Sequence, residues 1–402
     1  MGYGTVGSGV VKVINDNNAI VSKNAGDTLQ VKRILDLRDF PGDPYENLLT
    51  HDFNDILNDE EISIVVETMG GVGVAYKFTK ACLEAGKSVC TSNKELVAEH
   101  GRELMLTALE HGANYMFEAS CGGGIPIIRS LVSAVTGDEI EKVSGIINGT
   151  TNYILTQMHD NGTDFDEALA EAQRLGFAEL HPEADIEGFD PCRKIAILSS
   201  IAYDKAVDYK DIHCEGITKI SAEDFVYAEK FGMAIKLIAS SEKVKNGYAC
   251  LVAPRMVDET SPLAGVNGAF NAVFIRGNML GDAMFYGSGA GSLPTASAVV
   301  GDVVACAKYA GRNEMKIWSE EKLDLVPYDK IRSTFLVRVK GKPDDYIDRI
   351  EEVFGSVTPV TLAEFEDEEY AFVVSDMTEG AFNERYPKLK KAISFIRMEV
   401  AK

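Results

Sequence analysis

The 402-residue sequence predicts an α/β protein built from three folded segments. A glycine-rich turn leads into a helix at the amino terminus, and strands then alternate with helices through residues 1–125, the pattern of an open parallel sheet. Residues 126–315 mix helices and strands in an α+β order. After an acidic linker at 316–330, residues 331–402 follow the order strand, helix, strand, strand, helix, strand, which is typical of a ferredoxin-like domain.

The amino-terminal turn contains Gly2, Gly4 and Gly7 in the pattern G-x-G-x-x-G, and a helix with valines on one side follows. Glycines let the backbone approach a pyrophosphate, and a helix N-terminus faces the negative charge. The pattern predicts a Rossmann-type nucleotide-binding domain. The first strand of such a domain is missing before the motif. We therefore expect the turn to fray, and the strands at 29–37 and 62–66 to lose a shared partner.

The end of the strand at 29–37 carries the residues that would meet the ribose of a dinucleotide. An acidic residue there would bind the 2′-hydroxyl of NAD, whereas an arginine would accept the 2′-phosphate of NADP. Asp36, Arg38 and Asp39 all lie at this point, so both cofactors stay open.

Three polar residues follow three strands of the predicted parallel sheet. Thr68, Lys94 and Glu118 each lie at or just after the end of a strand. Ligands of open parallel sheets bind beyond the carboxyl ends of the strands. These residues are therefore candidates for the binding site, although a solvated loop lysine is the ordinary alternative for Lys94.

The middle segment is predicted to contain a helix at 127–135 and a strand at 141–147, with a polar turn at 148–152 that leads into another helix. The apolar spacing of 221–239 also predicts a helix. A second glycine-rich loop precedes a helix at 294–309, which we expect to return to the nucleotide-binding domain.

The chemistry of the middle segment centres on a lysine one turn into a helix. Helix 163–175 ends at Gly176, an acidic loop follows, and a second helix opens at Asp190-Pro191. Lys194 shares a face with an apolar stripe, and both the apolar surroundings and the helix N-terminus favour its neutral amine. Such a lysine suits proton transfer. The alternative is that Asp190 only caps the helix and Lys194 only pairs with it at i,i+4.

Composition excludes several classes of partner. Lys and Arg total 40 against 62 Asp and Glu, and the net charge of −22 argues against nucleic acid and anionic membranes. No apolar run is long enough for a membrane span, and no signal peptide is present. The seven cysteines lack any metal-binding spacing. We expect a cytoplasmic enzyme with reduced thiols.

Six motifs, in this order and spacing, resemble those of the homoserine dehydrogenase family over residues 1–315: GYGTVGSGV, TSNKELVA, EASCGGGIPII, INGTTNYIL, LGFAELHPEADIEGFDPCRKIAIL and GSGAGSLPTASAVVGD. The resemblance implies interconversion of L-homoserine and L-aspartate 4-semialdehyde with NADP or NAD. It places the enzyme in threonine, methionine and isoleucine biosynthesis.

The resemblance also implies roles for particular residues. Lys194 is the catalytic lysine, Lys94 lies near nicotinamide and substrate, and Glu179 and Asp190 bind the substrate. The expected cofactor-binding residues are Gly2, Gly4, Thr5, Val6, Gly7, Thr68, Lys94, Gly176 and Gly289. A structural sodium ion would be held by backbone oxygens of Glu118, Cys121, Gly123 and Ile125.

The tail at 331–402 resembles an ACT domain, whose family role is to bind an amino acid, usually threonine in this setting. The tail departs from that pattern at Lys342-Pro343-Asp344-Asp345, where a glycine is usual. A module that only dimerises the chain is therefore the second possibility, and a homodimer is expected in either case. The alternative function for the whole chain is a catalytically impaired amino-acid sensor with a degenerate nucleotide domain.

Overall fold

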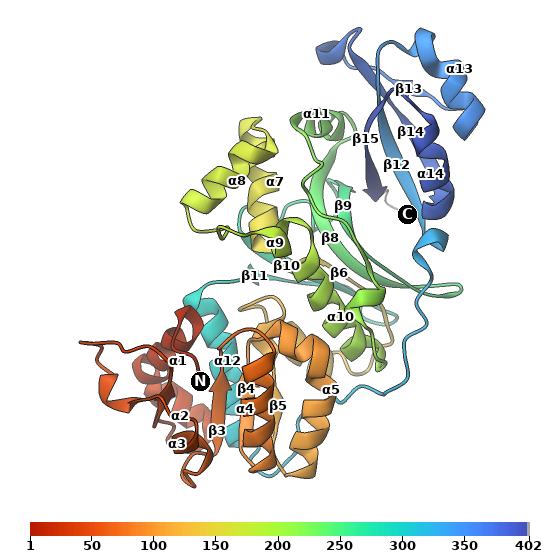
Figure 1. The fold of residues 1–402 in the computed structure, drawn as a ribbon. Helices are drawn as coiled ribbons and strands as arrows, with labels where there is room; N and C mark the ends of the chain where they lie inside the picture. The colour runs from red at the N-terminus through yellow and green to blue at the C-terminus, as the bar shows by residue number, and fades with distance from the viewer. Residues whose placement is uncertain (400–402) are drawn as a thin grey trace. The chain divides into compact units, whose positions relative to one another are not determined.

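The computed structural model describes residues 1–399, and its chain divides into two compact units (Figure 1). Unit 1 comprises Met1–Ile140, Arg193–Tyr209 and Asn271–Leu323. Unit 2 comprises Glu141–Cys192, Lys210–Phe270 and the chain from Asp324 onwards. No helix of the described residues is long and apolar enough to cross a membrane.

Unit 1 contains two parallel sheets rather than one. Strands β3, β4 and β5 pair in that order, and β1 pairs separately with β2. The elements of unit 1 are α1 (Thr5–Asp16), α2 (Asn18–Ala25), β1 (Ile34–Leu35), β2 (Leu49–Thr50), α3 (Asn54–Leu57), β3 (Ile64–Glu67), α4 (Gly73–Glu84), β4 (Ser88–Thr91), α5 (Lys94–Glu110), β5 (Tyr115–Met116), α6 (Ile127–Arg129), β10 (Phe270–Gly277), β11 (Gly281–Ser288) and α12 (Ser292–Lys308). The predicted strand at 29–37 is reduced to β1, because most of that stretch has no pairing partner.

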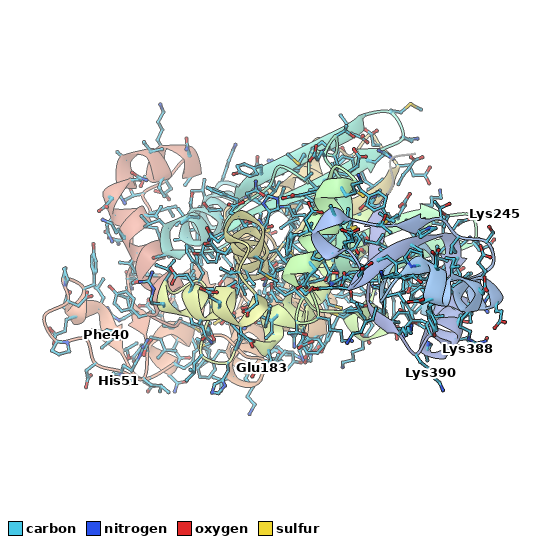
Figure 2. All side chains as sticks on the ribbon, turned by 90° about the horizontal axis from the view of Figure 1, so that it is seen from above. Phe40, His51, Glu183, Lys245, Lys388 and Lys390 are labelled. Carbon is cyan, nitrogen blue, oxygen red and sulfur yellow. The ribbon has the colours of Figure 1, made fainter. Side chains whose placement is uncertain are left out.

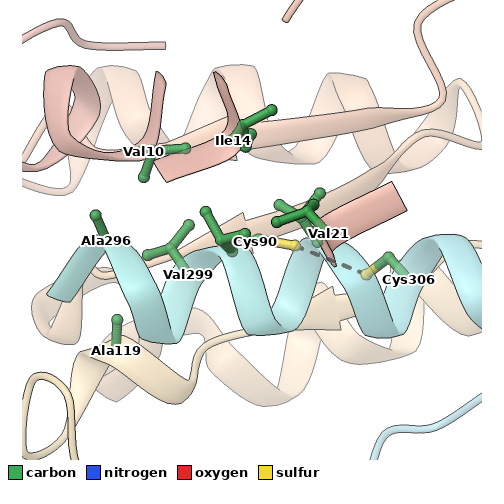
Figure 3. Close-up of a cluster of buried hydrophobic side chains, with 10 residues drawn as sticks. Val10, Ile14, Val21, Cys90, Ala119, Ala296, Val299 and Cys306 are labelled. Atoms are coloured by element: carbon green, nitrogen blue, oxygen red, sulfur yellow. Dashed lines mark hydrogen bonds between the residues drawn. The ribbon is translucent and has the colours of Figure 1, made fainter. Parts of the chain in front are cut away.

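Helix α12, over the stretch where a helix was predicted at 294–309, packs against α1 within unit 1. Val10 and Ile14 of α1 share a buried cluster with Ala296 and Val299 of α12 (Figure 3). Gly9 makes this close contact possible, because a Cβ there would lie 2.7 Å from the hydroxyl of a serine on α12. This packing holds the start of α1 against α12.

Unit 2 is built on a sheet in which β6, β8 and β9 are antiparallel neighbours. Its elements are β6 (Ile140–Ile146), α7 (Gly149–Asn161), α8 (Phe165–Arg174), α9 (Glu183–Ile186), β7 (His213–Cys214), α11 (Ala222–Lys230), β8 (Met233–Val244), β9 (Gly247–Asp258), β12 (Arg332–Lys340), α13 (Pro343–Phe354), β13 (Pro359–Val360), β14 (Glu369–Thr378), α14 (Glu379–Arg385) and β15 (Ala392–Glu399). One further helix, α10 (Phe189–Tyr203), spans the division between the two units.

The prediction of a helix over 221–239 is wrong beyond residue 230. Helix α11 ends before Gly232, whose φ of 62° is left-handed, and β8 begins at Met233. Pairing along the whole of β9, with Met233 opposite Asp258, determines the extended conformation. A nearly continuous apolar run fits a buried helix or a buried strand equally well, so periodicity alone misassigned it.

The tail confirms the predicted order strand, helix, strand, strand, helix, strand, and its sheet runs β15, β12, β14, β13. Aromatic and β-branched side chains of the tail form one buried cluster. Strand β15 also pairs in parallel with β9, with Arg397 opposite Arg255. The tail sheet therefore continues into the central sheet of unit 2.

Candidate active site

The glycine turn before α1 has the geometry of a phosphate cradle. Gly2 has a φ of +86°, and a Cβ there would lie 2.9 Å from the backbone of Thr68. A Cβ on Gly7 would lie 2.0 Å from the carbonyl oxygen of Gly2, so only glycine lets α1 approach the turn. Gly4 caps α1 without a side-chain hydrogen bond, and Thr5 and Val6 open the helix. The first amides of α1 thus have no side-chain cap, as an anion site requires.

The turn is tethered on both sides, so the expectation that it frays is wrong for residues 1–3. The amino group of Met1 donates to the carbonyl of Val66 at 2.7 Å, and the amide of Thr68 donates to the Met1 carbonyl at 2.9 Å. On the other side, the amide of Gly2 donates to the carbonyl of Leu35 at 2.8 Å. These backbone bonds join the turn to the segments at 35 and at 66–68.

Beyond these backbone bonds of Met1 and Gly2, a cavity of about 270 Å³ separates the two parallel sheets of unit 1. Residues 28–34 and 61–66 line its walls, and apolar side chains of α1 lie among its lining residues. Strands β1 and β3 belong to separate sheets and have no common strand partner among the described residues.

The corner expected to meet the ribose carries a compact ion pair. The carboxylate of Asp36 accepts two hydrogen bonds from the Arg38 guanidinium, both at 3.0 Å, and one from the amide of Tyr3 at 2.7 Å. The hydrogen bonds from Arg38 hold the pKa of Asp36 well below its usual range. His51 contacts the Asp36 carbonyl at 2.7 Å and the carboxylate of Asp39 at 3.0 Å. Both bonds raise the pKa of His51.

A buried network missed by sequence reasoning fixes the strand ends beside Lys94. The hydroxyl of Thr91 donates to the carboxylate of Glu67 at 2.6 Å, and both residues are fully buried. Asn93 caps α5, and its amide group donates to the carbonyl of Gly71 at 2.6 Å. Lys94 is the first residue of that helix. The sequence signal was an asparagine immediately before a helix, where a capping side chain is expected.

Glu118, the third of the residues at strand ends, is buried and anchors the loop that follows. Its carboxylate accepts hydrogen bonds from the amides of Ile128 and Arg129, each at 2.8 Å, and its own amide donates to Asp302 on α12 at 2.8 Å. Burial, and then the nearby Glu118, raise the pKa of Asp302 to about 7. The side chain of Arg129 donates to Asp302 at 2.6 Å. This network fixes the start of the loop against α12.

The loop from Cys121 to Ile125 is tightly wound and meets the second glycine-rich loop. Gly123 has a φ of +56°, and a Cβ there would lie 2.4 Å from the carbonyl oxygen of Gly289. The Cys121 thiol contacts the carbonyl of Lys194 at 3.7 Å. Cys121, Gly123 and Ile125 are buried. Unit 1 therefore brings the predicted sodium loop, the Gly289 loop and the Lys194 backbone together.

Unit 2 carries the remaining predicted site residues. Gly176 ends the α8 segment with a φ of +79°, and the backbone of Glu179 accepts a hydrogen bond from Gln173 at 3.0 Å. The side chain of Glu179 is exposed. Asp190 is buried, with 1% of its surface exposed, and its carboxylate accepts a hydrogen bond from Asn148 at 2.8 Å. Sequence reasoning marked the segment of Asn148 only as a polar turn.

Helix α10 carries both residues on which the predicted chemistry depends, the aspartate and the lysine. Asp190 and Lys194 lie one turn apart on it, and Lys194 is 8% exposed. The apolar stripe expected below the lysine is confirmed, because Leu198 and Ile201 are fully buried. The helix begins at Phe189, one residue before the predicted N-cap, which is an ordinary difference at a helix end.

A phosphate turn at the carboxyl edge of a parallel sheet, with a buried lysine on α10, defines a nicotinamide-dinucleotide-dependent oxidoreductase. A family model described as "Homoserine dehydrogenase, NAD binding domain" matches residues 2–118, and one described as "Homoserine dehydrogenase" matches residues 126–304. The chain belongs to the homoserine dehydrogenase family. It is an NAD(P)-dependent oxidoreductase that acts on the CH–OH group of homoserine.

Individual relatives agree with this assignment. The homoserine dehydrogenase of Bacillus subtilis is 40% identical over 315 residues, which cover 77% of this chain and 72% of the relative. A crystal structure of the enzyme from Thiobacillus denitrificans has a TM-score of 0.91 at 34% identity and covers 99% of this chain and 96% of that one. A hyperthermophilic archaeal homoserine dehydrogenase in complex with NADPH has a TM-score of 0.64 at 29% identity, with coverages of 76% and 95%.

Proposed function

We propose that Lys194 accepts the hydroxyl proton of L-homoserine as the alcohol is oxidised to L-aspartate 4-semialdehyde, and returns it in the reverse direction. The bound nicotinamide would supply the hydride acceptor. The observation that carries this assignment is the placement of a buried lysine one turn after a buried aspartate on α10. Lys94, at the start of α5, would assist by orienting substrate or cofactor.

The substrate's α-ammonium needs anionic partners, and we propose that Glu179 and Asp190 provide them. Asp190 is buried and held in place, whereas Glu179 is exposed on a loop of the same unit. The fixed carboxylate of Asp190 would orient the ammonium group of the substrate. The loop that carries Glu179 would bring its carboxylate onto the bound ligand.

Replacing Glu179 with leucine is expected to raise the KM for L-homoserine by about 10-fold or more, because a hydrogen-bonded ion pair is lost. The KM for the cofactor should change little. Glu183→Leu is the matched control, since Glu183 is an exposed acid of the same loop region (Figure 2). Steady-state kinetics check this. Unchanged KM values for both ligands in Glu179→Leu would make it an ordinary loop carboxylate.

The cofactor would bind at the glycine turn, with Gly176 and the Gly289 loop as further contacts. The exposed guanidinium of Arg38 faces the ribose corner, while the oxygens of Asp36 are occupied by Arg38 and Tyr3. Because the Asp36–Arg38 pair carries no net charge, it does not repel a 2′-phosphate as a single aspartate would. We propose that both nicotinamide cofactors bind and that NADP is preferred.

Adding an apolar strand of about six residues before Met1 is expected to raise the melting temperature and tighten NADP binding. The reason is that the cavity between 28–34 and 61–66 would be filled, and backbone groups on both walls would gain partners. An extension of six glycine and serine residues is the control. Thermal unfolding and cofactor titration measure the effect. Equal melting temperatures and affinities for the two extended forms would contradict it.

The loop from Glu118 to Ile125 suits a hard cation held by backbone oxygens, and we propose sodium as a structural ion there. Within the described residues no group of three or more His, Cys, Asp and Glu side chains could hold a metal. The loop is buried and contains consecutive left-handed glycines, Gly122 and Gly123. Buried carbonyl groups in a tight loop need partners, and oxygen is the ligand that such cations prefer.

We propose that residues 331–402 form an ACT-like regulatory domain and that threonine binds it and lowers activity. The strand order β15, β12, β14, β13 supports the domain type. Its continuity with β9 gives an effector a direct connection to the sheet of unit 2. A homodimer is also proposed, and the exposed strand β11 offers a pairing edge, since Met284 and Tyr286 on it are exposed.

Threonine is expected to release or absorb heat on binding to the full chain and to reduce the initial rate. Isothermal calorimetry and steady-state kinetics measure the two effects on the same preparation. The matched control ligand is L-valine, which has the same shape and lacks the hydroxyl. Absence of both heat and inhibition with threonine would leave the tail with a dimerising role only.

A further inference from the structure

The side chain of Asn148, at the junction of β6 and α7, connects two carboxylates of unit 2. Its amide nitrogen donates to Asp185 at 2.7 Å and to Asp190 at 2.8 Å. Asn148 is 6% exposed and Asp190 is 1% exposed, so the bond between them is shielded from water, whereas Asp185 is half-buried. Asp185 comes from α9 and Asp190 from α10, so one side chain sets the relative position of two helix starts.

The orientation of this amide is fixed by its other end. Its oxygen accepts hydrogen bonds from the backbone amide of Thr151 at 2.9 Å and from the Thr151 hydroxyl at 3.0 Å, and so caps α7. With the oxygen used as the cap, the nitrogen necessarily faces the two acids. All four hydrogen-bonding positions of the asparagine side chain are then used.

The side-chain amide of Asn148 reduces the electrostatic repulsion between Asp185 and Asp190. Two carboxylates that share one donor nitrogen lie close together, and two like charges at short range, one of them buried, are unfavourable unless donors stabilise both. The turn between the acids is also held tightly, because a Cβ on Gly188 would lie 2.9 Å from the sulfur of Cys214. The turn that joins the two acids is therefore closely packed.

We infer that Asn148 is a positioning residue of the substrate site. It holds Asp185 and Asp190 as a preformed anionic pair for the substrate's α-ammonium, with Asp185 as an additional acid of that site. This inference rests on the proposed role of Asp190. An ammonium has three donors, so a pair of fixed carboxylates satisfies more of it than one does. Preformed acids also avoid the cost of ordering them on binding.

The alternative is that Asn148 only caps α7, and one substitution separates the two roles. Serine is as good an N-cap as asparagine, but its hydroxyl is too short to bridge both acids. Asn148→Ser should keep the melting temperature close to that of the unchanged chain. It should raise the KM for L-homoserine by about 10-fold or more, as expected for lost hydrogen bonds to charged groups. The KM for NADP should stay unchanged.

A second variant adds a readout that a structural role would not produce. Asn148→Asp keeps the cap oxygen but puts a third carboxyl group beside Asp185 and Asp190. Its KM for L-homoserine should be high at pH 8 and should fall relative to the unchanged chain as the pH approaches 6, because a protonated carboxyl can donate again. Asp164→Ala is the matched capping control, since Asp164 caps α8 by accepting a hydrogen bond from Glu167. It should lower the melting temperature without changing KM.

Steady-state kinetics and thermal unfolding on the full chain decide the matter, with Asp190→Asn as the reference variant. If Asp190→Asn raises the KM for L-homoserine while Asn148→Ser and Asn148→Asp leave it within about two-fold, Asn148 is only a cap and the inference is overturned. If Asp190→Asn also leaves KM unchanged, the proposed substrate site itself is wrong. A parallel change in both KM values and the melting temperature would likewise assign Asn148 a structural role.

Discussion

Replacing Lys194 with alanine is expected to lower kcat by about 10²- to 10⁴-fold, the range for loss of a positioned proton acceptor. Affinity for NADP should stay nearly unchanged, because the glycine turn and α1 supply the cradle that binds it. The side chain is 8% exposed and lies on the face of α10 that carries Asp190. Water therefore has little access to replace the amine in the variant.

Lys205→Ala is the matched control for this experiment. Lys205 follows α10 closely and pairs with Glu321 at 2.6 Å on the surface. Its loss should leave kcat within about two-fold, since exposed ion pairs contribute little. Steady-state kinetics and cofactor titration are the measurements. A folded Lys194→Ala protein with near-normal kcat would remove Lys194 from the mechanism.

The largest stability loss is expected for Glu379→Ala in the tail. Glu379 is fully buried and accepts hydrogen bonds from the Arg397 guanidinium at 2.7 and 3.0 Å, from Ser333 at 2.7 Å and from Tyr328 at 2.9 Å. Removing it leaves the buried guanidinium of Arg397 with one acid fewer. Breaking a buried pair in this way costs about 3–5 kcal/mol. Urea unfolding measures the change in the free energy of unfolding.

Glu384→Ala is the control, because its ion pair with Lys388 is exposed and should contribute under about 1 kcal/mol.

The hydrogen-bond network around Glu379 also makes the stability of the tail depend on pH. Burial opposes ionisation of Glu379, but the hydrogen bonds and charge of Arg397, with the hydrogen bonds from Ser333 and Tyr328, together lower its pKa below the ordinary 4.5. Its stabilisation is therefore present above pH 4.5 and is lost as the pH falls through the folded value. Equal stability of Glu379→Ala and Glu384→Ala would contradict the network's role.

Local patterns predicted the elements that depend on local chemistry. The glycine turn, the helix with Asp190 and Lys194, and the order of the tail elements all follow from spacing and capping. Strand β8 was assigned as a helix, because its apolar run fits both structures and only pairing with β9 decides between them. Strand β11 was not predicted, since an exposed edge strand has no buried face to impose an alternating pattern.

Features that join distant segments could not be predicted from the sequence. The bond from Asn148 to Asp190 spans 42 residues, and the pairing of Arg397 with Arg255 joins the tail to a strand far earlier in the chain. Sequence reasoning also expected a frayed amino terminus, because it could not foresee the backbone bonds of Met1 to Val66 and Thr68. Each of these depends on packing between segments that have no shared local signal.

The most direct test is a steady-state assay of the full chain with L-homoserine and each nicotinamide cofactor. We expect reduced cofactor to form in step with L-aspartate 4-semialdehyde, faster at limiting NADP than at limiting NAD, with L-serine as the control alcohol. A folded chain that binds NADP and reduces none of it with L-homoserine would contradict the account. If that chain also bound threonine, it would be an amino-acid sensor rather than a dehydrogenase.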